Sequence, residues 1–241
     1  MKNAVHVNSV QVNGVQETTM KRDRTSAPAS SELSAGLSDE RRRGFDTTDI
    51  ARVAVFAAVV AVLGLPGGFA IFGAVPITAQ TLGVMLAGAI LGARRGAISM
   101  LVLLALVALG LPLLSGGRGG IGVFVGPSAG YLLGWVVGAF VIGAIVHVRG
   151  RRLTWLRTSL GVVAGGIVTV YAFGIPIQAD VTRLPLAETA LQSMVFLPGD
   201  IVKAAIAVAI TMTLVRAYPK AFRSASAVAR RKNPSTPDSP R

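Results

Sequence analysis

Apolar residues dominate the chain from about residue 50 to residue 217, and short polar or glycine-rich stretches divide them into six segments. Each segment has about 17 to 23 residues, which is the length that an α-helix rising roughly 1.5 Å per residue needs to cross about 30 Å of hydrocarbon. We therefore predict an all-α integral membrane protein with six transmembrane helices. The predicted spans are approximately 53–72, 75–93, 96–114, 127–148, 158–177 and 196–217.

Irregular or polar backbone accompanies several of these spans. The sequence Leu65-Pro-Gly-Gly68 interrupts the first span, which indicates a break that faces protein or water rather than lipid. A glycine-rich loop at 115–122 follows the third span, and a polar connection at 178–195 precedes the sixth. We expect the polar groups of the protein to gather at such places.

The charge of the chain is concentrated outside the apolar body. The net charge is +13, yet residues 50–218 contain only three acids, Asp180, Glu188 and Asp200. We predict a disordered cytoplasmic extension at 1–44, which lacks the apolar run of a signal peptide, a membrane domain at 45–217 and a basic, disordered cytoplasmic tail at 218–241. The positive charge therefore does not indicate a nucleic-acid partner.

The distribution of arginines predicts the orientation in the cell membrane. Basic residues are enriched on the cytoplasmic side of membrane proteins, and cytoplasmic termini leave only Arg118 and Arg183 outside. The basic residues that then lie inside include those of the C-terminal tail and Arg41, Arg42, Arg43, Arg52, Arg94, Arg95, Arg149, Arg151, Arg152, Arg157 and Arg216. With this multi-pass topology, the 66–76 loop, the 115–127 loop and the start of the sixth span meet on the external side, where we expect a pocket.

Composition excludes several classes of chemistry. The chain has no cysteine, and its two histidines, His6 and His147, are too few for a histidine metal site. It has no Gly-x-x-x-x-Gly-Lys-Ser/Thr motif, so any use of ATP must come from partner proteins. We expect no metal and no cofactor in this chain.

The stretch Phe196-Leu-Pro-Gly-Asp-Ile-Val-Lys203 carries the strongest functional signal, because it places Asp200 and Lys203 on one face of a membrane helix. Ionisable groups are costly in a bilayer and therefore mark functional sites, although two opposite charges can also simply neutralise each other. Asp200 alone would suit an ordinary helix start, because a carboxylate complements the helix dipole there. Lys203 is not explained in this way, so we favour a ligand site.

Weaker candidates lie in three other stretches. The loop Gly116-Gly-Arg-Gly-Gly-Ile-Gly122 allows close approach of its backbone to a ligand, and Gly126-Pro-Ser-Ala-Gly-Tyr131 adds an aromatic wall, but such loops also serve only as tight turns. Thr78, Gln80 and Thr81 either bind a ligand or satisfy backbone groups that Pro76 frees. Small residues at four-residue spacing, including Ala54 and Ala58, indicate helix packing or contact with a partner.

These motifs together resemble the BioY family, the biotin-binding S component of energy-coupling factor (ECF) vitamin transporters. The resemblance covers about residues 50–217 and rests on Val75-Pro-Ile-Thr-Ala-Gln-Thr-Leu-Gly83 with Leu91-Gly-Ala-Arg-Arg-Gly96, on the glycine-rich loop with Tyr131, and on Leu197-Pro-Gly-Asp-Ile-Val-Lys203. It implies a six-helix S component that binds biotin from outside. The substrate contacts expected on these motifs are Asp200, Lys203, Tyr131, Gln80, Thr78, Gly116, Gly117, Arg118 and Gly120.

Charge suggests Lys203 for the biotin carboxylate and Asp200 for the ureido N–H groups. The resemblance also implies that Ala54 and Ala58 meet a transmembrane coupling protein driven by two cytoplasmic ATPases. Whether the chain works alone, as a homo-oligomer or only with those ATPases stays open. Two alternatives from other classes are a proton-coupled carrier in which Asp200 titrates, and a membrane enzyme with Lys203 as nucleophile. The apolar body of the chain offers no further acid, thiol or histidine triad to complete the chemistry of such an enzyme.

Overall fold

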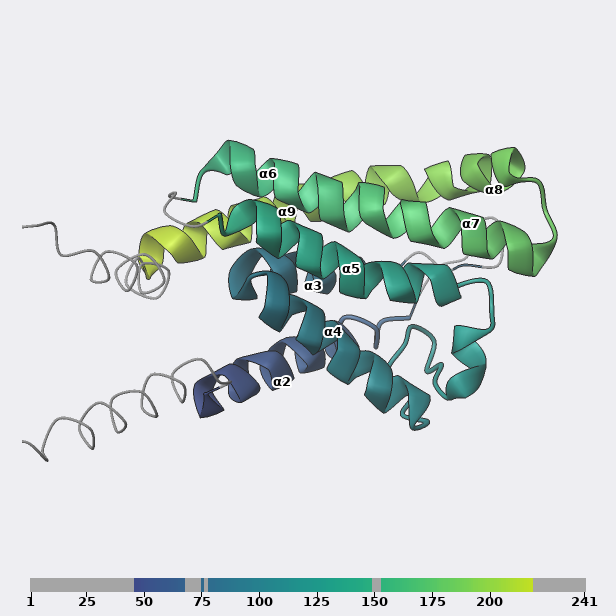
Figure 1. Ribbon diagram of the computed structural model, residues 1–241, viewed down its shortest axis with the longest axis horizontal. Helices are drawn as coiled ribbons and strands as arrows, with labels where there is room; N and C mark the ends of the chain where they lie inside the picture. Colours follow the sequence, from purple (N-terminus) through teal and green to yellow (C-terminus); the bar gives the residue numbers. More distant parts are fainter. Residues whose placement is uncertain (1–45, 68–74, 76–77, 149–152, 219–241) are drawn as a thin grey trace, which may run out of the picture. The chain divides into compact units, whose positions relative to one another are not determined.

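The computed structural model describes residues 46–67, 75, 78–148 and 153–218, and within these residues the fold is built from helices. Figure 1 shows their arrangement. The longer helices are α2 (Thr47–Val62), α3 (Gln80–Leu91), α4 (Ala93–Ala108), α5 (Ala129–Val146), α6 (Trp155–Val163), α7 (Val170–Thr182), α8 (Leu186–Ser193) and α9 (Leu197–Ala217). Three short ones are η1 (Ile121–Phe124), the π-helix η2 (Ala164–Thr169) and η3 (Met194–Phe196).

In the described part of the chain, three helical stretches are long and apolar enough to cross a membrane. They are Ala129–Val146, Trp155–Thr182, which joins α6, η2 and α7, and Leu186–Ala217, which joins α8, η3 and α9. The 16 residues of α2 or α4 extend roughly 24 Å and the 12 of α3 roughly 18 Å, less than a typical hydrocarbon layer.

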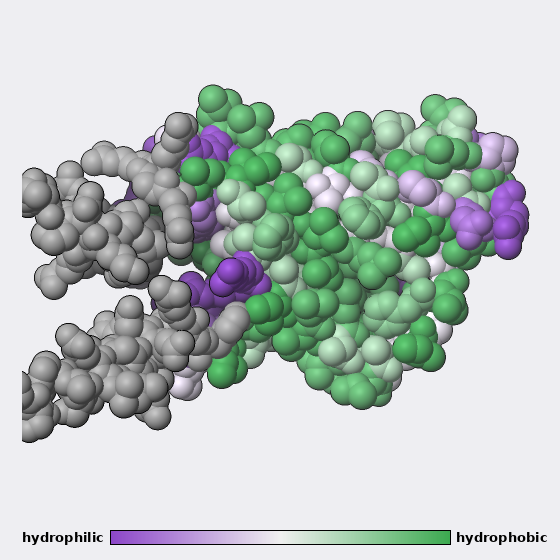
Figure 2. Space-filling model, viewed as in Figure 1, coloured by the Kyte–Doolittle hydropathy of each residue, from purple (hydrophilic) through white to green (hydrophobic). Residues whose placement is uncertain are grey.

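The surface has the polarity expected of a membrane protein. In Figure 2, apolar residues cover the middle of the face shown and hydrophilic residues lie toward its two ends. Large apolar side chains that are exposed to the surroundings occur on several helices: Leu101, Leu133, Phe140, Leu160, Val168 and Ile206. Lipid, rather than water, is the solvent in which so much exposed apolar surface is stable.

The predicted spans and the observed helices differ at several boundaries, since α2 ends at Val62 and α4 at Ala108, short of the predicted ends at 72 and 114. The 178–195 stretch, predicted as a polar connection, is mostly helical, because α7 continues to Thr182 and α8 begins at Leu186. In α8, Thr189 and Ser193 are buried, and their hydroxyls donate to carbonyls one turn back, so polar residues occupy an interior face. Among the described residues of the predicted second span, the helix begins at Gln80, and Gly92 with φ 82° separates α3 from α4.

Several predicted segments lie outside the described residues. These are 1–44, 68–74 and 76–77 in the first external loop, 149–152 in the basic loop, and all but Tyr218 of the C-terminal tail.

Glycines allow α5 to lie at the centre of the helical body, where it packs against α3, α4, α6 and α7. A Cβ at Gly138 of α5 would meet the backbone of Gly165 in η2, and a Cβ at Gly165 would meet the backbone of Gly138. Helices α5 and η2 therefore touch through their main chains. Gly88 of α3 lies against the neighbouring part of α5, at Ala139 and Ile142. Small residues thus give the close approach that packing in membranes requires.

Two local features set the positions of residues that matter below. The π-helix η2 adds a wider turn just before Val170 and Tyr171, and the Thr169 hydroxyl donates to the Ala164 carbonyl at 2.8 Å within it. At the N-terminal end of α2, Asp49 pairs with Arg95 of α4 at 2.8 Å. The first feature shapes the cavity wall, and the second fixes α2 to α4.

Candidate functional site

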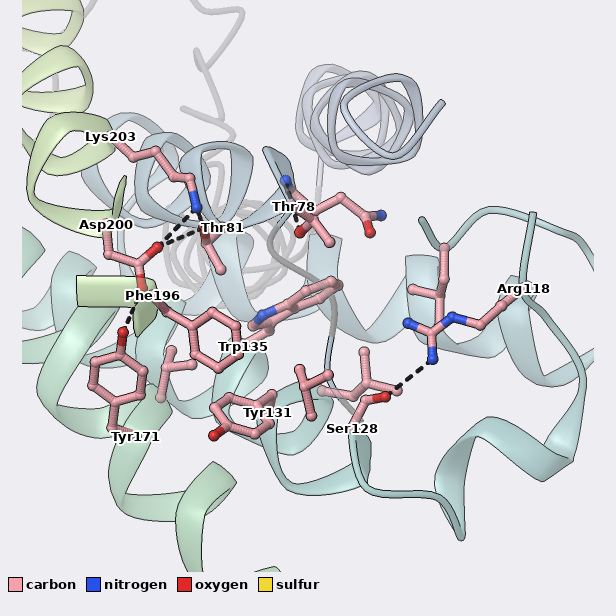
Figure 3. A pocket seen from close by; sticks show the side chains of 15 residues that line it. Thr78, Thr81, Arg118, Ser128, Tyr131, Trp135, Tyr171, Phe196, Asp200 and Lys203 are labelled. Atoms are coloured by element: carbon pink, nitrogen blue, oxygen red, sulfur yellow. Dashed lines mark hydrogen bonds and ion pairs between the residues drawn. The ribbon is translucent and has the colours of Figure 1, made fainter. Parts of the chain in front are cut away.

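A cavity of about 60 Å³ lies among the N-terminal ends of α3, α5 and α9, the η2–α7 junction and the loop after α4 (Figure 3). Its wall combines ionisable, hydroxyl and aromatic groups with aliphatic side chains. The residues that line it are Val75, Thr78, Gln80, Thr81, Leu114, Arg118, Ser128, Tyr131, Leu132, Trp135, Val170, Tyr171, Phe196, Asp200 and Lys203. Pockets for small molecules usually measure about 300 Å³ or more, so a vitamin-sized ligand requires the lining groups to move apart.

Asp200 and Lys203 of α9 form an ion pair in this wall, with Nζ 2.9 Å from Oδ1. The Lys203 side chain is 15% exposed and that of Asp200 is 8% exposed, so both charges are largely removed from solvent. Thr81 of α3 lies between them: its hydroxyl donates to Asp200 Oδ1 at 3.3 Å and accepts from Lys203 Nζ at 3.1 Å. The i,i+3 spacing predicted from the sequence therefore brings the two groups together.

Tyr171 of α7 completes the surroundings of this carboxylate. Its hydroxyl donates to Asp200 Oδ2 at 2.7 Å, so both carboxylate oxygens accept hydrogen bonds from protein. A buried charge is stable only when it is paired and hydrogen-bonded in this way. Asp200 is thus held in one orientation by contacts from α3, α7 and its own helix.

Arg118 reaches the cavity from the glycine-rich loop. Its Nε donates to the Ser115 carbonyl at 3.2 Å and its Nη1 donates to Ser128 Oγ at 3.1 Å, which anchors it at the start of α5. Both acceptors are neutral, and among the described residues Arg118 forms no ion pair with a carboxylate. A guanidinium has five N–H donors, so Arg118 keeps donors for a ligand.

Three of the predicted contacts, Gly116, Gly117 and Gly120, are not among the residues that line the cavity. Their φ values of 75°, 70° and 83° are ones that side-chain-bearing residues rarely adopt. The turn that contains Gly116 and Gly117 lets Leu114 and Arg118 pair through their backbones, and both of these residues line the cavity.

Gln80 and Thr78 lie at the cavity wall, as predicted, but their polar groups are occupied. The Gln80 amide donates to the carbonyls of Val60 and Leu113 and accepts from the Ser115 N–H. Thr78 Oγ1 accepts from the Gln80 backbone N–H at 3.3 Å. Gln80 therefore joins α2, α3 and the glycine-rich loop at the site.

Aromatic rings form the third part of the wall. The Tyr131 ring meets those of Tyr171 and Phe196 edge to face, with centroids 6.4 Å apart in both pairs. The Tyr131 hydroxyl contacts Gln178 and Ser193 at 2.8 and 3.0 Å, so its ring rather than its hydroxyl faces the cavity. Such a wall suits an apolar ring or chain.

The sequence indicated Tyr131, whereas Tyr171, Trp135, Phe196 and Ser128 were not predicted as contacts. A tyrosine in the middle of an apolar span was the available signal for Tyr171, because a hydroxyl placed there needs a buried partner. Ala54 and Ala58, predicted to meet a partner, are exposed on α2 and lie outside this cavity. In the described residues, no three metal-ligating side chains come together.

Comparison with known proteins adds independent information. Residues 35–220 match the BioY family model. The chain is 46% identical over 179 residues to the biotin transporter BioY of Rhizobium etli, covering 72% of this chain and 96% of that protein. It is 44% identical over 170 residues to the probable biotin transporter BioY of Bacillus subtilis, covering 70% and 91%.

A solved structure is similar as well. It is the crystal structure of the S-component for biotin from an ECF-type ABC transporter, with a TM-score of 0.65 and 34% sequence identity. The match covers 70% of this chain and 91% of that chain. The family match spans well over half of the sequence, and the relatives are matched over nearly their full length. The chain therefore belongs to the BioY family.

Proposed function

We propose that this protein takes up biotin as the membrane-embedded, substrate-specific component of an ECF-type transporter, moving biotin from outside to the cytoplasm. The observation that carries the proposal is a cavity inside an apolar helical body that combines a buried Asp200–Lys203 pair with a separate cation, Arg118. Biotin combines an apolar ring and chain with a ureido group and a carboxylate. The relatives named above are biotin transporters, which agrees with this chemistry.

The Asp200–Lys203 pair fits the ureido group of biotin. The two charges offset each other at 2.9 Å, so a further full charge on the ligand gains little from Lys203. A neutral ureido group instead offers N–H donors to the Asp200 carboxylate and a carbonyl acceptor to the Lys203 ammonium. This assignment replaces the expectation from charge alone, in which Lys203 binds the carboxylate.

Arg118 fits the carboxylate of biotin. It has no acidic partner among the described residues, and guanidinium binds a carboxylate through two parallel hydrogen bonds. In Figure 3, Arg118 and the Asp200–Lys203 pair lie on opposite sides of the cavity. A ligand with polar groups at both ends and an apolar middle therefore matches the wall, whose centre is aromatic and aliphatic.

Binding of labelled biotin to the purified protein in detergent tests this proposal. We expect Asp200→Asn and Arg118→Gln each to weaken binding by tenfold or more, because each leaves a polar group of the ligand without its charged partner. Asp180→Asn and Arg183→Gln are matched controls, since their side chains are 77% and 86% exposed and pair with each other at 3.5 Å, away from the cavity lining.

A second ligand separates the two ends of the site. The methyl ester of biotin lacks the negative charge, so Arg118→Gln should weaken binding of biotin far more than binding of the ester. Absence of biotin binding by the unmodified protein would contradict the proposed function. Equal affinity of all variants would contradict the site.

We further propose that the protein spans the cell membrane six times with both termini in the cytoplasm. We also propose that the exposed face of α2, with Ala54 and Ala58, meets the coupling protein. Two cytoplasmic ATPases would then supply the energy from ATP, and this chain needs no cofactor of its own. Uptake by membrane vesicles with and without the coupling protein, the ATPases and ATP tests the dependence. Uptake driven by a proton gradient alone would favour the secondary-carrier alternative.

A further inference from the structure

Trp135 of α5 carries a polar group that none of the contacts above uses. Its side chain is 5% exposed and lines the cavity. Its indole nitrogen, Nε1, is buried and has no hydrogen-bond acceptor among the described residues. The indole N–H can only donate, so the partner that would satisfy it must be an acceptor. Buried donors without partners are rare, and one at a ligand cavity points to the ligand as its partner.

The helix geometry fixes Trp135 on the inner wall. Ser128, Tyr131, Leu132 and Trp135 all line the cavity, and their spacing of three, four and seven residues places them on one face of α5. In Figure 3, the indole lies between Arg118 on one side and the Asp200–Lys203–Thr81 cluster on the other, with its nitrogen on the side of the cluster. The N–H therefore lies where the ureido group is placed by the proposed function.

We propose that Trp135 is a specificity-determining residue whose Nε1–H donates to the ureido carbonyl oxygen of biotin. This inference rests on the proposed function. Biotin offers three kinds of acceptor: the carboxylate is assigned to Arg118, the ring sulfur is a weak acceptor, and the ureido oxygen is a strong one with two lone pairs. Trp135 and Lys203 together can fill both lone pairs, while Asp200 accepts from the ureido N–H groups.

The consequence is selectivity for cyclic ureas. A site built to hydrogen-bond a particular group rejects analogues that lack it, because its own buried polar groups then stay unpaired. Apolar contacts with the ring and chain provide much weaker discrimination. Trp135 would thus contribute to choosing the ureido head of the ligand rather than only filling space beside it.

The substitution Trp135→Phe tests this role, because it keeps an aromatic ring and removes the N–H. We expect biotin and desthiobiotin, which lacks the sulfur, to bind on the order of tenfold more weakly to this variant. The thiourea analogue, in which sulfur replaces the ureido oxygen, should bind the variant and the unmodified protein about equally. The matched control is Trp155→Phe, since Trp155 is 47% exposed on α6 and is the only other tryptophan of the chain.

Two outcomes of the binding series would overturn the inference. One is unchanged affinity of Trp135→Phe for biotin. The other is an equal loss for biotin, desthiobiotin and the thiourea analogue, which would mean that the ring acts only through packing. If the unmodified protein binds no biotin, the proposed function fails instead, so the two failures are distinguishable.

A spectroscopic measurement on the unmodified protein keeps the inference testable should Trp135→Phe not fold. The chain has two tryptophans, so its indole N–H region contains two resonances, and Trp155→Phe identifies that of Trp135. Formation of the hydrogen bond should move the Trp135 proton resonance downfield when biotin is added and slow its exchange with solvent. An unchanged Trp135 resonance in protein saturated with biotin would overturn the inference.

Discussion

The orientation of the Asp200 carboxylate depends on residues from three helices. Lys203 and Thr81 contact Oδ1, whereas Oδ2 accepts, within the described part of the chain, from Tyr171 at 2.7 Å. A carboxylate held from both sides presents its remaining lone pairs in fixed directions, which favours one ligand geometry. The contribution of Tyr171 can therefore be separated from that of the ion pair by removing a single oxygen atom.

We predict that Tyr171→Phe weakens biotin binding by about fivefold, which corresponds to about 1 kcal/mol for one hydrogen bond. The reason is that Asp200 loses its only donor on Oδ2 among the described residues and can rotate away from the ligand. Equilibrium binding of labelled biotin measures the effect. Tyr218→Phe is the control, because Tyr218 is 66% exposed beyond the end of α9. Wild-type affinity in Tyr171→Phe would show that this hydroxyl does not position Asp200.

Which of these residues could be predicted depends on how far apart they are in the sequence. Asp200 and Lys203 are three residues apart on one helix, so helix periodicity alone brings them together. Tyr171 and Trp135 reach the same cavity only through the packing of α7, α5 and α9, and the wider turn at η2 changes the register before Tyr171. Local pattern does not determine such contacts, and for that reason Tyr171 and Trp135 were not among the predicted contacts, whereas Tyr131 was.

Helices α5 and α7 show how packing between elements supports the cavity. Gly174 of α7 lies directly against the ring of Tyr131 on α5, and a Cβ at this position would overlap the ring carbons. Gly130 of α5 lies against the backbone of Phe173 in the same interface. The aromatic wall is therefore supported from behind by a contact that only glycine allows.

We predict that Gly174→Ala lowers stability by about 1–3 kcal/mol, the usual cost of inserting a methyl group into a well-packed interface. Biotin affinity should fall as well, because the Tyr131 ring is pushed toward the cavity. Gly199→Ala in α9 is the matched control: its added Cβ has no neighbour within 4 Å, and alanine favours helix. Thermal unfolding in detergent compares the two variants. Equal midpoints would mean that the α5–α7 contact adapts without cost.

Hydropathy predicts the apolar segments of the chain better than it predicts where the helices begin and end. Hydropathy predicts an apolar segment for each of α2 to α5 and for the helical stretches 155–182 and 186–217, but it does not reveal α8, whose buried face carries Thr189 and Ser193. It also overestimates α3, since the described apolar residues Val75 and Ala79 precede the first residue of the helix, Gln80. Hydropathy alone does not show that polar residues can be buried against protein rather than exposed to lipid.

At the scale of the whole molecule, the side of the membrane on which the N-terminus lies depends on whether α2, α3 and α4 cross the membrane. These helices extend only roughly 18–24 Å, so a crossing requires non-helical backbone covered by other helices for the remaining distance. If they cross, three spans precede α5 and the N-terminus is cytoplasmic. If they do not, everything before α5 lies outside and the chain has three spans. The two topologies place the α3–α4 turn on opposite sides.

Cysteine labelling distinguishes these topologies, because the chain contains no cysteine of its own. We predict that a membrane-impermeant maleimide labels Val125→Cys in intact cells but labels Arg94→Cys only after permeabilisation. Both positions are exposed, Val125 at 76%. Arg94 lies in the first turn of α4, and Val125 follows η1 in the loop that comes after the other end of α4. Asp180→Cys is the external reference, since it lies outside in either topology. Labelling of Arg94→Cys in intact cells would mean that α2, α3 and α4 do not cross and that the six-span topology is wrong.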